Sequence, residues 1–331
     1  MPHSDNISIS LIIPVHYGGA NFQRCLTNLS AIRPLLKEII VVADGETDSS
    51  WRLAEEAGIQ VIKIPSPKGP AAARNLGAQK ATGDILFFLD ADVAVSPDAV
   101  DHILLAFQRP GLTAVFGSYD DEPFEPDFFS QHKNLFHHYV HQTAKEEAST
   151  FWGACGAIRR DIFMEAGGFD EKYRHPSIED IELGYRLKRA GYKIRLLKDL
   201  KVKHLKRWDI ITLLKTDFFY RALPWIDLIL SRGRLIDDLN LKISNRISVL
   251  CIYLLLPTLF VSFFIPWFLI PSIVFLIVIL TINREFYIFL YNKRGPGFVF
   301  KSIFWHWFYF FYCGLAFLIG LARHQFEKSI S

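Results

Sequence analysis

The sequence predicts an α/β domain with helices on both faces of a sheet, followed by amphipathic helices and a helical membrane region. Over the first hundred residues, short β-branched runs alternate with helical stretches, which is typical of parallel strands joined by helices. From about residue 247 onward the chain is instead dominated by Phe, Ile, Leu, Val, Trp and Tyr. This change in composition marks the main boundary between domains.

Four buried strands and the helices between them are expected at the start of the chain. Each strand is a short apolar run bounded by polar or glycine-containing segments. A serine and a proline, Ser96 and Pro97, then provide an N-cap and a first-turn proline for a further helix through Phe107. The expected strands are Ile9–Val15, Glu38–Ala43, Gln60–Ile64 and Ile85–Leu89, and the expected helices are Asn21–Ser30, Ser49–Ala57 and Pro70–Ala81.

The overall charge and the cysteine content exclude other classes of protein. A formal net charge of +3 is too small to argue for nucleic-acid binding, and no basic run interleaved with aromatic residues occurs before the apolar region. The cysteines lack metal-ligand or disulfide spacing, and the N-terminal segment does not resemble a secretory signal. We therefore expect a reduced, cytoplasmic N-terminal domain. The cysteines are Cys25, Cys155, Cys251 and Cys313.

Acidic residues follow two of the expected strands at the point where each strand ends. Asp44 follows the second strand, and Asp90 and Asp92 follow the fourth. Ligands of such sheets bind beyond the carboxyl ends of the strands, so the three acids fall on one edge. Two carboxylates separated by one residue suit a hard divalent cation that carries substrate phosphates. A role in capping the turn is the structural alternative for Asp90 and Asp92.

A second acidic pair, Glu179 and Asp180, opens an expected helix that runs to about Ala190. Acidic side chains are favoured in the first turn of a helix whatever their chemistry. The spacing alone therefore leaves a structural role open beside a catalytic one.

Five segments between residue 8 and about residue 208 together resemble the family-2 glycosyltransferases of the GT-A fold. In chain order they are SLIIPVHYGG, VVADGETDSS, KGPAAARNLGAQKATGDILFFLDADV, GACGAIRRDIFMEAGGFDE and IEDIELGYRLKRAGYKI. The resemblance implies a Rossmann-like mixed sheet with helices on both faces. It also implies a nucleotide diphosphate sugar as donor and a divalent metal, Mg²⁺ or Mn²⁺.

The resemblance implies roles for residues on the donor side. Asp44 would contact the nucleotide base, Asp90 the ribose or base side as well as the metal, and Asp92 the metal that bridges the diphosphate. The segment around Asp44 departs from the two acids and serine often found in the family, so the base stays open. Further residues would line the nucleotide pocket, namely Pro14, Lys68, Arg74 and Asn75.

On the acceptor side, the resemblance implies that Asp180 is the catalytic base and that Glu179 places the acceptor. An inverting transfer needs a base, because the acceptor hydroxyl loses its proton as it attacks an oxocarbenium-like centre. Downstream, His204 begins His-x-x-Arg-Trp, which is similar to the Gln-x-x-Arg-Trp motif of membrane-bound polysaccharide synthases. We expect His204 to bind the metal or phosphate, and Arg207 and Trp208 to bind the donor. Contact of the Arg-Trp pair with lipid is the alternative.

The segment 127–147 carries four histidines at near-helical spacing. No carboxylate or cysteine framework accompanies them, so we expect a loop and helix beside the acceptor cleft, in contact with lipid, rather than a metal cluster. The histidines are His132, His137, His138 and His141.

The apolar region is long enough for two membrane spans. Residues 247–282 carry no charge, whereas one span needs about 20 residues. We expect spans at about 247–265 and 266–283, with the turn marked by prolines at 266 and 271, and a third candidate at 298–322. Basic residues flank this region and put the catalytic domain on the cytoplasmic side. They are Arg246, Arg284, Lys293 and Arg294.

Residues 208–245 are expected to form amphipathic helices on the cytoplasmic leaflet. Aromatic side chains there mix with Lys215 and Arg221 at near-helical spacing. Such helices would present the head group of a lipid acceptor to Asp180, and plain packing between domains is the alternative. The expected domains are thus 1–207, 208–245 and 246–331.

These features predict an inverting, metal-dependent hexosyltransferase. It would move a sugar from a nucleotide diphosphate sugar to a hydroxyl of a lipid or lipid-linked acceptor at the cytoplasmic membrane face. A polyprenyl-phosphate glycosyltransferase attacks with an ionised phosphate and needs no base, so Glu179 and Asp180 favour a hydroxyl acceptor. Nucleotidyl transfer would need a glycine-rich, arginine-containing loop, which PVHYGGANF does not supply.

Two further alternatives stay open. A processive polysaccharide synthase subunit must thread its polymer through the bilayer, and two or three helices are few for a channel unless a homo-oligomer or a partner adds more. An inactive membrane scaffold has no need of the four acids Asp44, Asp90, Asp92 and Asp180.

Overall fold

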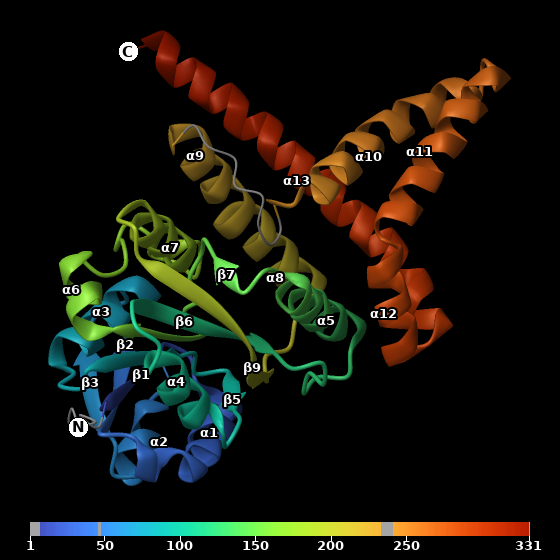
Figure 1. Cartoon of the computed structure of the whole chain (residues 1–331). Coiled ribbons are helices and arrows are strands. Elements are labelled where there is room, and N and C mark those ends of the chain that lie inside the picture. Colours follow the sequence, from blue (N-terminus) through green and yellow to red (C-terminus); the bar gives the residue numbers. More distant parts are fainter. Residues whose placement is uncertain (1–6, 46–47, 233–240, 331) are drawn as a thin grey trace. The chain divides into compact units, whose positions relative to one another are not determined.

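The computed structural model describes residues 7–45, 48–232 and 241–330. The chain divides into two compact units, 1–209 and 210–331 (Figure 1), which we call the N-terminal and C-terminal units. The division falls just after the boundary expected at 207.

The N-terminal unit is built on a mixed sheet. Over the described residues the sheet has nine strands, in the order β3-β2-β1-β4-β8-β6-β9-β5, with β7 paired to β9. The half from β3 to β4 is parallel, whereas β8 pairs antiparallel with both β4 and β6. The strands are β1 (Ile9–Val15), β2 (Glu38–Asp44), β3 (Gln60–Ile64), β4 (Ile85–Leu89), β5 (Val93–Val95), β6 (Leu112–Tyr119), β7 (Glu147–Ala148), β8 (Cys155–Arg159) and β9 (Lys193–His204).

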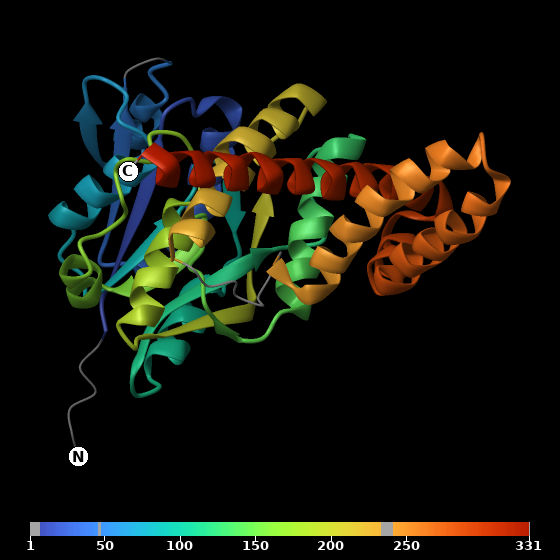
Figure 2. The ribbon, with the colours of Figure 1, turned by 90° about the horizontal axis from the view of Figure 1, so that it is seen from above.

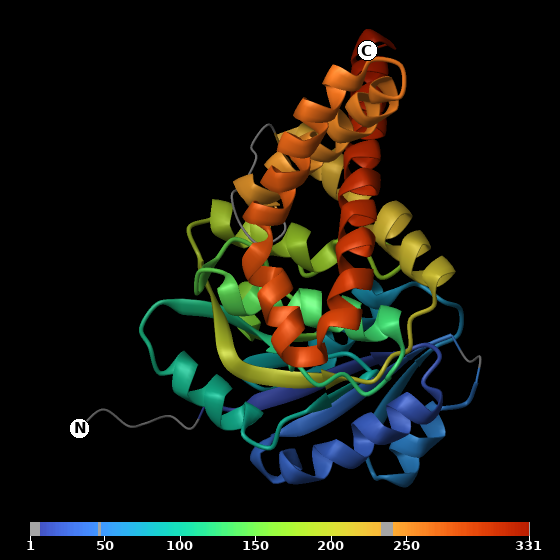
Figure 3. The same ribbon diagram turned by 90° about the vertical axis from the view of Figure 1, so that its right-hand side faces the viewer.

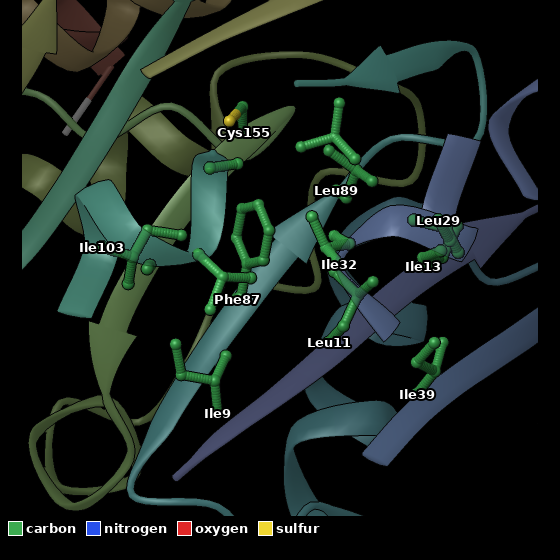
Figure 4. Close-up of a cluster of buried hydrophobic side chains, with 14 of the residues drawn as sticks. Ile9, Leu11, Ile13, Leu29, Ile32, Ile39, Phe87, Leu89, Ile103 and Cys155 are labelled. Atoms are coloured by element: carbon green, nitrogen blue, oxygen red, sulfur yellow. The ribbon is translucent and has the colours of Figure 1, made fainter. Parts of the chain in front are cut away.

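Helices cover both faces of this sheet, as expected. Because side chains alternate along a strand, Leu11 and Phe87 pack with α1, α2 and α4 in one core cluster (Figure 4). On the other face, Phe88 packs on Phe163 of α6, and Gly77 of α3 lies against Ile12. The helices are α1 (Gly19–Asn28), α2 (Trp51–Glu56), α3 (Pro70–Lys80), α4 (Ala99–Phe107), α5 (Phe128–Thr143), α6 (Arg160–Glu165) and α7 (Glu179–Arg189), with short 3₁₀ turns at Leu29–Ala31 and Arg33–Leu35.

One expected helix boundary was wrong. Helix α4 does not begin with Ser96 as N-cap; it begins at Ala99, with Asp98 at the N-cap and no side-chain capping bond. The reason is tertiary, since β5 pairs with β9 as far as Val95. The next three residues must then turn the chain, and the Ser96 carbonyl accepts a bond from the Ala99 amide.

The C-terminal unit is helical. Its helix α13 is continuous and long (Figure 2), and α10 and α11 run side by side (Figure 3). The elements are α8 (Ile210–Lys215), the π-helix η3 (Thr216–Ala222), α9 (Leu223–Arg232), α10 (Ile243–Ser262), the 3₁₀ turn η5 (Pro266–Phe268), α11 (Leu269–Ile282), α12 (Arg284–Arg294) and α13 (Pro296–Ile330). The expected interface region 208–245 includes residues 233–240, which lie outside the described part.

Two helices of the described part are long and apolar enough to cross a membrane, α10 and residues 296–326 of α13. The third candidate, expected at 298–322, is thus part of α13. The span expected at 266–283 is instead η5 and the 14-residue α11, and residues 266–282 meet α12 at a bend of 61°. Together these two segments make either one broken span or a re-entrant loop.

A buried polar contact holds the bend to α10. The side-chain Nδ2 of Asn283 donates to the Ser248 hydroxyl at 3.0 Å and to the Ile279 carbonyl at 2.8 Å. A side chain that ends α11 and also bonds α10 satisfies polar groups that would otherwise be unpaired among apolar residues.

Candidate active site

Asp92 and His204 are brought together by the pairing of β5 with β9. Val93 lies opposite His204 in this antiparallel ladder, and the Leu205 amide donates to the Asp92 carbonyl at 2.9 Å. As a result, the His204 Nε2 lies 4.0 Å from the Asp92 Oδ2. The Asp92 side chain is 32% exposed, whereas the His204 side chain is buried.

This pair can supply some of the ligands of a divalent cation, but not all. Within residues 7–45, 48–232 and 241–330, no group of three or more His, Cys, Asp or Glu is arranged to hold a metal. A carboxylate and an imidazole at this separation fit a cation that receives its remaining ligands from substrate phosphates and water. The predicted metal residues Asp92 and His204 are therefore neighbours in the structure.

Asp90, the third predicted metal residue, is held by Arg74 of α3. The guanidinium of Arg74 donates to the Asp90 Oδ1 at 2.6 Å and to the Glu179 Oε1 at 2.9 Å. Burial lowers the pKa of Arg74, but the charges of Asp90 and Glu179 outweigh this effect and raise that pKa above its ordinary value. The ion pairs therefore hold the guanidinium charged inside the protein.

A glycine makes room for this guanidinium. A Cβ at Gly153 would lie 3.2 Å from the Arg74 Cζ, so any side chain there would press on the Arg74 ion pairs. Arg74 was expected to line the nucleotide pocket, and the structure shows it buried between two acids from distant parts of the chain.

Glu179 and Asp180 are adjacent in α7 but lie in different surroundings. Glu179 is buried, bonded to Arg74 and, through its Oε2, to the Ser177 amide at 2.9 Å. Asp180 is half-buried; its Oδ2 accepts from the Gly153 amide at 3.0 Å and its Oδ1 from the Ile181 amide at 2.8 Å. Of this pair, Asp180 is the acid with the more accessible carboxylate.

Asp44 ends β2 and holds the loop that leads to α3. Its two carboxylate oxygens accept from the amides of Lys68 and Gly69, each at 2.7 Å. Gly69 has a positive φ of 97°, and a Cβ there would lie 2.4 Å from the Arg174 carbonyl oxygen, so a glycine is required. The Lys68 side chain is exposed, and the half-buried Pro14 lies in β1 next to β2.

Asn75 is buried in α3 and bonds the loop before α7. Its amide nitrogen donates to the Phe169 carbonyl and to the Glu171 carboxylate, and its Oδ1 accepts from the Phe169 amide, all at 2.9 Å. This side chain, expected to line the nucleotide pocket, connects α3 to the loop after α6.

Arg207 and Trp208 follow β9 and differ in exposure. The Arg207 side chain is 76% exposed, and its Nε lies 3.9 Å from the Asp127 Oδ2. Trp208 is buried, and its amide donates to the Ser130 hydroxyl at 2.8 Å. Trp208 thus anchors the chain to the first turn of α5, and its expected contact with a donor stays a prediction.

The histidine-rich segment forms α5, with Asp127 as its N-cap. The Nδ1 of His138 donates to the Tyr119 carbonyl at 2.7 Å, and the Nδ1 of His141 to the Gly117 carbonyl at 3.1 Å. These histidines therefore attach α5 to the end of β6. Burial lowers the pKa of His138 below its ordinary value, which favours the neutral ring.

Sequence reasoning did not single out Tyr119 and Trp152, and it noted Gly153 only as the first residue of the segment GACGAIRR. Tyr119 stacks on His204, and Trp152 directly precedes the glycine whose amide holds Asp180. The only local signal was an aromatic residue before the segment GACGAIRR, which does not by itself indicate a site.

Comparisons with known proteins bear on the family. Residues 10–167 match the family described as glycosyl transferase family 2. A pre-mycofactocin glycosyltransferase of Mycobacterium tuberculosis is 28% identical over 221 residues, which cover 64% of this chain and 46% of that protein. A dolichol-phosphate mannosyltransferase of Pyrococcus furiosus is 27% identical over 118 residues, or 34% of each chain. The chain spans less than half the length of these curated relatives.

A solved structure bears on the fold. A mannosyltransferase from Pyrobaculum calidifontis, in complex with GDP-Man and Mn²⁺, superposes with a TM-score of 0.58 at 16% identity, covering 94% of this chain and 86% of that one. The likeness agrees with the GT-A-like mixed sheet. The likeness shows the fold alone, whereas the family match shows that residues 10–167 belong to a glycosyl transferase family 2 domain.

Proposed function

We propose that the protein transfers a sugar, with inversion, from a nucleotide diphosphate sugar to a hydroxyl of a lipid or lipid-linked acceptor at the cytoplasmic face of a membrane. One observation carries the proposal. Two half-exposed acids, Asp92 beside His204 and Asp180 beside Gly153, each stand next to an acid that is paired with Arg74. One acid serves the donor and the other serves the acceptor.

On the donor side, Asp92 and His204 would hold a Mg²⁺ or Mn²⁺ ion carried by the diphosphate. When bound, such a cation neutralises charge on the leaving diphosphate. Asp92 would provide a carboxylate oxygen and His204 its Nε2. The complex of the Pyrobaculum calidifontis mannosyltransferase with GDP-Man and Mn²⁺ supports this assignment. Asp44 would act on the nucleotide by holding the loop that presents Lys68.

On the acceptor side, Asp180 would take the proton of the attacking hydroxyl. The acceptor oxygen forms a bond to the anomeric carbon, the bond from that carbon to the diphosphate oxygen breaks, and the proton passes to the Asp180 carboxylate. The amide of Gly153 orients this carboxylate. The sequence predicted that Glu179 places the acceptor. Its bonds to Arg74 and to the Ser177 backbone support a role in positioning Arg74, which we propose instead.

The C-terminal unit supports a membrane location. Large apolar side chains are exposed at the turn after α10, among them Phe263 (82%), Phe264 and Trp267. In water this exposure is costly, whereas a bilayer accommodates it. Ile211 and Phe219 are similarly exposed on α8 and η3, which supports placing these helices against the lipid interface.

The direct test is a donor and acceptor screen with the full-length protein in detergent. UDP-, GDP- and other nucleotide sugars would be offered with Mn²⁺ or Mg²⁺ and a native lipid extract, and products identified by mass spectrometry. We expect one donor to be used with an acceptor hydroxyl, with the inverted anomer seen by NMR. A sugar phosphate as product would favour the polyprenyl-phosphate alternative, and a protein that neither binds nor hydrolyses any donor would favour the scaffold. Protease access in sealed vesicles of known orientation tests the side of the membrane.

A further inference from the structure

Three rings of the N-terminal unit contact one another in series, from His204 of the proposed metal pair through Tyr119 to Trp152. Tyr119, the last residue of β6, stacks on His204 with ring centroids 4.4 Å apart and an interplanar angle of 25°. The ring of Trp152 meets Tyr119 edge to face, at 4.9 Å and 90°. We call Tyr119 and Trp152 the aromatic wall.

Each end of the aromatic wall is connected to one of the half-exposed acids. At the Tyr119 end, the stacked His204 places its Nε2 4.0 Å from the Asp92 Oδ2. At the other end, Trp152 precedes Gly153, whose amide donates to the Asp180 Oδ2 at 3.0 Å. A molecule that reacts between Asp92 and Asp180 would therefore lie beside these two rings.

The burial of these rings separates them from core aromatics. Phe88 and Phe151 are fully buried, whereas Tyr119 and Trp152 are only partly buried, although both also pack against the main core cluster. Helix α5 backs the wall, since the His137 ring lies 4.7 Å from Trp152 and 4.5 Å from Tyr119. These contacts hold both rings in place, and each residue keeps part of its surface exposed.

We propose that the aromatic wall is the acceptor subsite and that its ligand is a sugar ring. Within the function proposed above, on which this inference rests, the acceptor hydroxyl would then belong to a glycolipid or a lipid-linked sugar, not to a sugar-free lipid alcohol. The face of a pyranose ring carries C–H groups of slight positive charge, which complement the negative face of an aromatic ring. Stacking on Trp152 would direct a hydroxyl at the ring edge toward Asp180.

Truncation of Trp152 in the full-length protein tests this assignment. The probe is the glycolipid fraction of the native extract, compared with its sugar-free lipid fraction. For Trp152→Ala we expect the apparent KM for the glycolipid fraction to rise about tenfold or more, while donor binding stays within about twofold of wild type. Trp152→Phe should retain most of the affinity, because a phenyl ring still offers a flat face.

Trp51 provides a matched control. It is also half-buried and also packs against the main core cluster, but it belongs to α2 and is covered by the Lys63 ammonium, 3.0 Å from its ring centroid. Trp51→Ala should lower thermal stability as much as Trp152→Ala while leaving the acceptor KM unchanged.

The outcomes separate this inference from the proposed function. Wild-type transfer to the sugar-free fraction alone, or an unchanged acceptor KM in Trp152→Ala, would overturn the subsite. If Trp152→Ala does not fold, quenching of wild-type tryptophan fluorescence by the glycolipid fraction, and its loss in Trp152→Phe, is the expected result; an unchanged signal in Trp152→Phe counts against the wall. Absence of transfer to any fraction by the wild type would instead refute the proposed function.

Discussion

The N-terminal unit has two acidic pairs, Asp90 with Asp92 and Glu179 with Asp180. The guanidinium of Arg74 binds one acid of each pair. Arg74 binds Asp90 after β4 and Glu179 at the start of α7, at 2.6 Å and 2.9 Å. The second acid of each pair is half-exposed and has another partner, His204 for Asp92 and the Gly153 amide for Asp180. In the proposed function, the Asp-x-Asp and the Glu-Asp would thus be used alike, with one acid to position and one to react.

The pairs differ in how deeply the positioning acid is buried. The side chain of Asp90 is 31% exposed, whereas that of Glu179 is 5% exposed. Water therefore screens the Asp90 end of the Arg74 bridge and hardly reaches the Glu179 end. We therefore expect the ion pair of Arg74 with Glu179 to contribute more to stability than the ion pair of Arg74 with Asp90.

The largest effect, on the rate of transfer, is expected for Asp180, the proposed catalytic base. Asp180→Asn keeps the shape and removes the base, so transfer should fall by about a hundredfold to ten thousandfold, while donor binding by calorimetry is retained. Asp101→Asn, in the first turn of α4, is the matched control and should be neutral. Near-normal turnover of Asp180→Asn would remove Asp180 as the base.

The next largest effect, on stability, is expected for Glu179, the buried acid beside Asp180. Glu179→Ala leaves the buried Arg74 without one partner, which should lower the free energy of unfolding by about 3–5 kcal/mol, measured in denaturant on the full-length protein. Glu147→Ala removes an exposed ion pair with Lys188 and should change the free energy of unfolding far less, because water screens that pair. Equal losses in the two variants would contradict the burial argument.

The reacting acid of the donor pair should show a smaller effect, seen in binding. Asp92→Ala should weaken Mn²⁺-dependent donor binding by about tenfold or more, because one ligand of the cation is lost, and should leave metal-free binding unchanged. Asp98→Ala is the control. It breaks a surface pair in which the Asp98 Oδ2 lies 3.2 Å from the His102 Nε2, and donor binding should not change. Unaltered metal dependence in Asp92→Ala would rule out its ligand role.

The smallest effect on stability is expected for Asp90→Asn. Its carboxylate is partly solvated and Arg74 keeps Glu179, so the loss should be about 1 kcal/mol or less, measured in the same denaturant series. A loss as large as that of Glu179→Ala would show that the two ends of the bridge are equivalent and would break the comparison.

The sequence predicted the parallel half of the sheet well and the antiparallel half hardly at all. The expected bounds of β1, β3 and β4 match the structure because each is a short, mainly apolar run between turn signals. The short β5 could not be found this way, since three residues carry no pattern and Val93 is a strand residue only through its pairing with His204. The misplaced start of α4 has the same cause.

The sequence likewise predicted some features of the candidate site and not others. The acids and His204 could be predicted as site residues because their motifs are local and resemble those of a known family. The ion pair between Arg74 and Glu179 could not be predicted, because it joins residues 105 positions apart. Trp152 was missed because a single aromatic residue carries no signal until Tyr119 and Asp180 lie near it.

The amino-acid sequence by itself determined which side chains are present for chemistry and which segments are apolar enough for a membrane, since both properties depend on residue type and local spacing. Only the tertiary structure decided which acid of each pair is bound and neutralised by Arg74. That choice depends on where one guanidinium lies when α3, the end of β4 and the start of α7 come together. No local pattern contains this information, because the three segments meet only when the sheet is complete.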